Sequence, residues 1–198
     1  MLPRGATAMS ERLTGVGLEV DPHEFLHPTL TFLRRYWDSK RGGRAMPSRS
    51  DIRPSELKDH LGWVILVEVL PEFSDFRYKL VGTLVTQYYL EDTTGKTVRE
   101  AFGRKGGEAA RNGVLAMFRK CARDRVVLRI HGDAGWIAPG FEEFESICLP
   151  LSDDGAHCNM ILHAFVFNRE RVMLAREIAR ANGGKILVEP ATTRGKAR

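Results

Sequence analysis

The chain has 198 residues, 43% of them hydrophobic, which is enough for one core but leaves little room for a second domain. Its longest apolar stretch, from Trp63 to Val67, is far shorter than the roughly 20 residues that a membrane-spanning helix needs, so we expect no membrane span. Thirty Lys and Arg against 25 Asp and Glu give a net charge of +5, which lies in the range of ordinary soluble proteins.

The N-terminal part of the chain divides into a tail and a helix. Residues 1–20 are rich in Gly, Ser, Thr and Arg without periodicity, and we predict that they are disordered. Leu30, Leu33 and Trp37 then recur at helical spacing, and glycine at position 42 is typical of a helix end. The pattern predicts an amphipathic helix that begins at Pro28 and precedes the core.

A possible metal motif lies just before this helix. His23-Glu24-Phe25-Leu26-His27 matches the H-E-x-x-H pattern of zinc proteases, in which both histidines share one helical face. Because Pro28 disfavours the helical conformation at His27, the segment favours a capped entry turn instead. We predict no metal site here.

Five later segments have the character of strands. Residues 76–80 and 126–131 alternate apolar and polar side chains, which predicts edge strands with one wet face. Residues 63–70 and 160–167 are almost entirely apolar on both parities, which predicts strands covered on both faces at the centre of a sheet. Residues 144–151 complete the set.

Helices are predicted between the second and third of these strands and after the fifth. The stretch 84–124 contains a capping-box pair, Thr97 and Glu100, and then a longer helix with one apolar face. A final helix is predicted over 169–182, which ends at two glycines. We therefore predict a single domain over 21–185, with flanking helices, followed by a flexible basic tail over 186–198.

Several short motifs carry a family resemblance. They are Pro47-Ser48-Arg49, Phe76-Arg77-Tyr78, Val81-Gly82-Thr83, Thr94-Gly95-Lys96, and Leu149-Pro150-Leu151 before Asp153-Asp154-Gly155. Over about residues 28–168 the chain resembles a family of stand-alone bacterial PAS-like proteins. The resemblance implies an α+β fold: a five-stranded antiparallel sheet in the order 2-1-5-4-3, helices between strands 2 and 3, and an N-terminal flanking helix. The edge and centre assignments made from side-chain alternation agree with that order.

Six side chains are predicted to meet in an interior cleft between the long helix and the sheet, where a ligand of apolar or mixed character would bind. The predicted set is Tyr78, Met117, Phe118, Cys121, Leu128 and His163. His163 interrupts an apolar strand, so it is either a structural histidine with one hydrogen-bond partner or a ligand contact. Cys121 fits a core position equally well, because a free cysteine packs like a small hydrophobic residue.

The resemblance implies specific residues for two cofactors, haem and a covalently reacting flavin. Compared with cofactor-binding PAS domains, the long helix has no histidine for haem, and the Asn-Cys-Arg motif of a covalently reacting flavin is missing. The three cysteines, at positions 121, 148 and 158, match no zinc or disulfide spacing. An odd count of free thiols is typical of a reducing compartment, and no signal sequence or anchor is predicted before Asp21, so we expect a cytoplasmic protein.

The resemblance implies a sensory or signalling module that binds a small molecule, a signalling protein or both, without catalysis of its own. Two alternatives stay open. A cone-shaped α+β enzyme acting on a small apolar substrate would need an acid–base pair such as an Asp with His163, and no clear pair is visible. A nucleic-acid binder would use the basic segment 34–53, which lacks the basic-aromatic strand motif of such proteins.

The helix from Pro28 also suggests an oligomer. Phe32 and Tyr36 lie partly off its apolar stripe, and side chains beyond one contact tend to be buried elsewhere. We predict a homodimer through this helix, as is common in PAS domains. The alternative is that both aromatic side chains pack on residues 43–53 of the same subunit.

Overall fold

The structure is a computed structural model, and it describes residues 16–89, 92–102, 107–132 and 143–167. The predicted helix over 169–182 and the predicted basic tail over 186–198 lie outside the described residues. All other elements discussed below fall within them.

One antiparallel sheet of six strands forms the centre of the fold, in the order β1-β4-β5-β6-β2-β3. The strands are β1 (Val16–Val20), β2 (Val64–Val69), β3 (Phe76–Val81), β4 (Leu128–Gly132), β5 (Phe144–Leu151) and β6 (Met160–Phe167). β2 and β6, both predicted to be internal, are internal. β5 and β6 are buried over nearly their whole length, because helices cover both faces of the sheet there.

The predicted five-stranded sheet is wrong in strand number: the five predicted strands follow one another as β3-β2-β6-β5-β4, and a sixth strand, β1, lies beyond β4. β1 pairs with β4, so β4 is not the edge strand that its alternation predicted. Two polar side chains of β4 pair with β1: Arg129 Nη1 donates to Glu19 Oε1 at 2.9 Å, and His131 Nε2 lies 3.2 Å from the same oxygen. The prediction that residues 1–20 are disordered is therefore wrong for residues 16–20.

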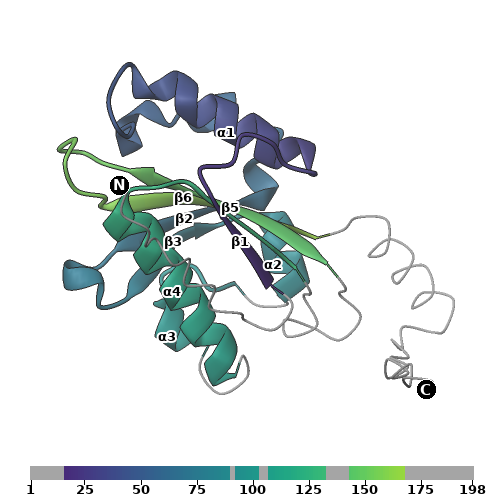
Figure 1. The fold of residues 1–198 in the computed structure, drawn as a ribbon. Coiled ribbons are helices and arrows are strands. Elements are labelled where there is room, and N and C mark those ends of the chain that lie inside the picture. The colour runs from purple at the N-terminus through teal and green to yellow at the C-terminus, as the bar shows by residue number, and fades with distance from the viewer. Residues whose placement is uncertain (1–15, 90–91, 103–106, 133–142, 168–198) are drawn as a thin grey trace, which may run out of the picture.

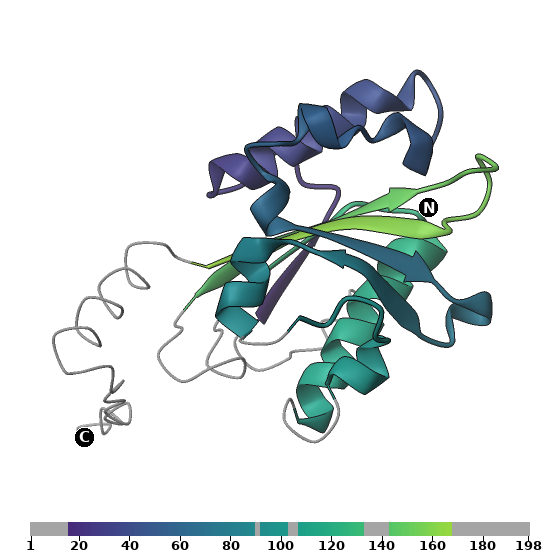
Figure 2. The same cartoon turned by 180° about the vertical axis from the view of Figure 1, so that it is seen from behind.

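Helices lie on the two faces of the sheet (Figures 1 and 2). They are α1 (Pro28–Arg41), α2 (Thr83–Tyr89), α3 (Val98–Ala101) and α4 (Glu108–Asp124), with 3₁₀ turns η1 (Arg49–Asp51), η2 (Pro54–Glu56), η3 (Leu61–Trp63) and η4 (Pro71–Phe73). α1 lies on one face, here called the outer face, and α3 and α4 lie on the opposite, inner face. The predicted capping box of α3 is present, with Thr97 and Glu100 each accepting the other's backbone N–H.

The start, the end and the buried face of α1 agree with the sequence pattern that predicted the helix. Pro28 occupies the first turn, and the helix ends at Gly42, whose φ of 56° is favourable for glycine. His27 has an extended backbone and caps the helix by accepting the N–H of Thr29 at Nδ1, so the H-E-x-x-H segment is an entry turn, as predicted. The apolar stripe is buried against the sheet, where the Trp37 indole N–H donates to the backbone oxygen of Pro150 at 2.8 Å.

A buried carboxylate fixes the start of α1 to the outer face. Glu145 of β5 accepts the backbone N–H groups of Leu26 at 3.0 Å and His27 at 2.8 Å. Its Oε1 also accepts from Arg129 Nε of β4 at 2.6 Å, and Arg129 in turn reaches Glu19 of β1. One network therefore joins three strands to the entry of α1.

Candidate functional site

Three of the predicted site residues meet around one aromatic ring on the inner face. Phe118 points from α4 onto the sheet, and its ring centroid lies 5.3 Å from that of His163 on β6. The rings of Phe76 and Tyr78 on β3 lie 5.4 and 6.5 Å from it. These are ordinary contact separations for tilted and edge-to-face rings, so Phe118 is packed on several sides.

Two more of the predicted residues adjoin this ring cluster through Cys148 of β5. Leu128 lies opposite Cys148 in the sheet, and Cys148 lies opposite His163, so the three side chains share the inner face. Cys148 Sγ lies 3.4 Å from His163 Nδ1. The Cys121 thiol on α4 lies near Cys148, which adds to the rise in its pKa. Five of the six predicted residues are thus brought to one place and buried.

The sixth, Met117, is only partly buried and packs at the margin of the core. Two members of the cluster were not in the predicted set. Phe76 could have been found, because it has the same strand parity as Tyr78. Cys148 gave no such signal, because β5 is apolar on both faces and parity cannot assign a side.

His163 is held as a neutral imidazole. Burial lowers its pKa to about 4, although its hydrogen bond to the backbone oxygen of Ile147 acts in the opposite direction. A neutral ring with its proton on Nδ1 donates to that oxygen, which lies 2.8 Å away. The structural role that the sequence left open is therefore supported by a specific partner.

This low pKa predicts a pH-dependent stability. An unfolded histidine, with a pKa near 6.5, takes up a proton that folded His163 refuses, so stability is complete above about pH 6.5 and is lost as the pH falls toward 4. The difference amounts to about 3 kcal/mol of unfolding free energy. Urea unfolding at a series of pH values would measure it.

His163→Asn is the test variant, because its side-chain N–H can still donate to Ile147. We expect the slope between pH 6.5 and 4.5 to disappear in this variant and to persist in His157→Asn, a matched change at a histidine whose side chain is 86% exposed. Carboxylates with lowered pKa, such as Asp153, titrate below this window. A slope that survives in His163→Asn would contradict the assignment.

At the predicted site the inner face is closely packed with buried side chains. Phe118 is 1% exposed, Leu128 and Cys121 are fully buried, and His163 is 4% exposed. Two hollows lined by described residues, one at the end of α4 and one beneath η2 and η3, include none of the six predicted residues. In this structure the ring of Phe118 occupies the centre of the predicted site.

The site shows no catalytic pairing among the described residues that contact His163. Nδ1 meets a backbone oxygen and a thiol, not the carboxylate that an acid–base pair requires. Burial raises the pKa of the Cys121 thiol above its usual value and that of Cys158 to about 12, so neither forms a reactive thiolate at neutral pH. Within the described ranges, no group of three potential metal ligands comes together.

Of the helices that the structure describes, none has the length and apolar character to cross a membrane. No match to the chain is found among curated proteins or among solved structures. The family model described as PAS domain matches residues 25–164, which is more than half of the chain and includes α1, strands β2 to β5 and most of β6. The chain therefore belongs to the PAS domain family.

Proposed function

We propose that this protein is a signalling module that works by binding a partner protein, without catalytic activity of its own. Membership of the PAS domain family supports a sensory or signalling role in general. The observation that favours a protein partner is the filled inner core, in which the Phe118 ring packs against Phe76, Tyr78 and His163. Because the core is packed, a signal would be received on the exposed surface of the protein. The free, buried thiols suit a cytoplasmic protein.

A small-molecule sensor is the second candidate, and His163 favours it. A buried imidazole beside aromatic rings is the kind of polar group that orients a ligand in an apolar pocket. A ligand would have to displace the ring of Phe118 to reach it. This candidate therefore requires a conformational change that the partner-binding proposal does not.

The enzyme and nucleic-acid alternatives have less support. The enzyme would need a carboxylate beside His163, whose Nδ1 instead contacts the backbone oxygen of Ile147 and the thiol of Cys148. The nucleic-acid binder needed available cations in 34–53, but several of them pair with carboxylates of the same chain: Arg34 with Asp21 and Asp38, Lys40 with Glu56, Arg41 with Asp38, and Arg44 with Asp51.

The contacts of α1 support packing within one subunit, the alternative to a homodimer, although the partners lie in residues 53–60 and not mainly in 43–53. The ring of Phe32 stacks on His60 at 4.1 Å. The hydroxyl of Tyr36 donates to Glu56 at 2.7 Å and accepts the backbone N–H of Arg53 at 3.0 Å. Both aromatic side chains are thereby engaged with residues 53–60, so the surplus apolar surface that motivated a dimer is largely used.

Native mass spectrometry of the freshly purified full chain tests the proposal. We expect the mass of a bare monomer, because the inner core is filled and the aromatics of α1 are packed within the subunit. A small molecule retained at one equivalent would contradict the partner-binding proposal and support the sensor. A dimer that is lost when Phe32 is replaced by alanine would contradict the packing of the α1 aromatic side chains within one subunit.

A further inference from the structure

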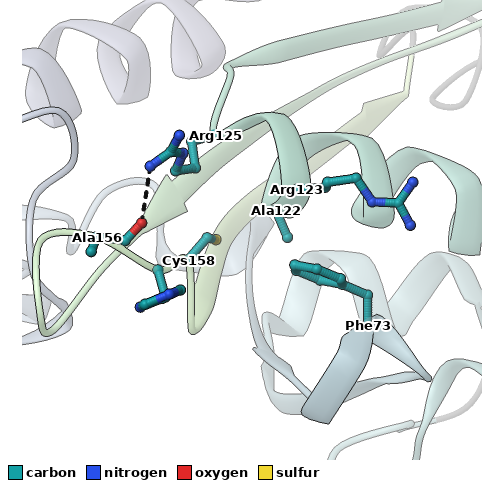
Figure 3. A pocket seen from close by; sticks show the side chains of 7 residues that line it. Phe73, Ala122, Arg123, Arg125, Ala156 and Cys158 are labelled. Carbon is teal, nitrogen blue, oxygen red and sulfur yellow. Dashed lines mark hydrogen bonds between the residues drawn. The ribbon is translucent and has the colours of Figure 1, made fainter.

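A hollow of about 340 Å³ lies at the surface where α4 ends, between η4 and the hairpin that joins β5 to β6 (Figure 3). Its volume falls in the range of small-molecule sites, about 300–1,000 Å³. It is lined by Phe73, Ala122, Arg123, Arg125, Ala156, His157 and Cys158. It lies outside the Phe118 cluster and shares no residue with it.

The lining combines an apolar floor with cationic sides. Cys158 and Ala122 lie between the two arginines in Figure 3, with Arg125 on one side and Arg123 beside Phe73 on the other. None of these seven described residues carries a carboxylate. The nearby Asp154 is bonded to His157 Nδ1 at 2.7 Å, outside the lining.

Both guanidinium groups are held in place. Arg125 Nη1 donates to the backbone oxygen of Ala156 at 3.1 Å, and the Arg123 guanidinium carbon lies 5.8 Å from the centre of the Phe73 ring. Phe73 is itself fixed by a turn with φ of 55°, whose carbonyl accepts from Arg119 Nε at 3.0 Å. The bond to Ala156 uses one of the five N–H donors of Arg125, which leaves others for a ligand.

Arg125 also stands where a glycine is usual. It ends α4 with a φ of 57°, in the left-handed region that side chains other than glycine seldom adopt. Basic residues often lie at a helix C-terminus because they complement the partial negative charge there. That explanation does not account for where these two point, since Arg125 bonds to the hairpin and Arg123 lies over Phe73.

We propose that this hollow binds a small organic anion, with a carboxylate or phosphate group against the Arg125 guanidinium and an apolar or aromatic body on Ala122 and Cys158 toward Phe73, where Arg123 adds a second positive charge. Two full positive charges outweigh the partial negative charge of about one half at the end of α4. A guanidinium fork matches both kinds of oxyanion. This inference goes beyond the proposed function and does not depend on it.

The test uses the full chain and four probes: benzoate, phenyl phosphate, acetate and inorganic phosphate. We expect one of the two aromatic anions to bind with a Kd on the order of millimolar, because the site is small and open on one side. Acetate and inorganic phosphate, which lack the ring, should bind at least about tenfold more weakly. Calorimetry gives the affinities, and amide NMR shifts at positions 73 and 156 locate the site.

Three variants separate this site from general attraction by a basic protein. Arg125→Gly removes the guanidinium where the backbone favours glycine, and Arg123→Gln removes the other. Arg125→Gly should weaken the aromatic anion at least about tenfold, and Arg123→Gln, on the far side of the hollow, should weaken it by a smaller factor. Lys58→Gln lowers the net charge equally at an exposed position outside the hollow and should change the affinity less than about twofold.

Several results would overturn the assignment. These are a failure of both aromatic anions to bind at millimolar concentration, equal binding of acetate and benzoate, or an effect of Lys58→Gln as large as that of the arginine variants. Because Arg125→Gly relieves backbone strain, loss of binding in that variant cannot be ascribed to unfolding if its melting temperature is unchanged or raised.

Discussion

Replacing Glu145 with alanine is expected to lower the free energy of unfolding by about 3–5 kcal/mol, the loss typical when one partner of a buried ion pair is removed. The side chain is 7% exposed and accepts from Leu26, His27 and Arg129. Its loss leaves two backbone N–H groups without their acceptor and Arg129 without its nearer carboxylate. Urea unfolding at pH 7 measures the change.

Two matched variants show which part of the network matters. Glu145→Gln keeps one oxygen acceptor but loses the charge, so we expect a smaller loss, about half of that for alanine. Glu143→Ala removes the same type of side chain from an exposed position two residues earlier, and it should change stability by less than about 0.5 kcal/mol. A loss under about 1 kcal/mol in Glu145→Ala would mean that the network does not hold α1 to the sheet.

This network also explains why the sequence predicted β4 to be an edge strand. The alternation of apolar and polar residues in β4 predicts an edge strand with one face in solvent. In the structure, Arg129 of β4 pairs with Glu19 of β1 and with Glu145 of β5. β1 itself was missed because it has only five residues, of which Leu18 and Val20 are about half exposed. A strand that buries so little apolar surface leaves a weak pattern in the sequence.

The inner face was better predicted, for reasons of geometry. Helical period placed Phe118 and Cys121 on one side of α4, and strand parity placed Tyr78 and Leu128 toward it. Neither period determines whether the side chains leave a void between helix and sheet. That depends on the rotamer of the Phe118 ring and on the helix–sheet distance, which are properties of three-dimensional packing.

Replacing Phe118 with alanine is expected to lower the free energy of unfolding by about 3–5 kcal/mol, because a fully buried ring is removed and its neighbours cannot close the space. The cavity would be bordered by Phe76, Tyr78 and His163. An apolar cavity of this kind remains dry and binds small aromatic molecules. Phe118→Leu, which keeps most of the apolar volume, should lose only about 1–2 kcal/mol.

The same variants decide between the two candidate functions. If the core is filled, benzene or indole should raise the melting temperature of Phe118→Ala but leave that of the wild type and of Phe118→Leu unchanged. If the wild type is stabilised as much as Phe118→Ala, the ring moves aside without mutation, and the small-molecule sensor becomes the better account. If the substitution Phe118→Ala does not lower the stability and the ligands do not raise its melting temperature, Phe118 does not fill the core, and the packing of the core no longer favours a protein partner.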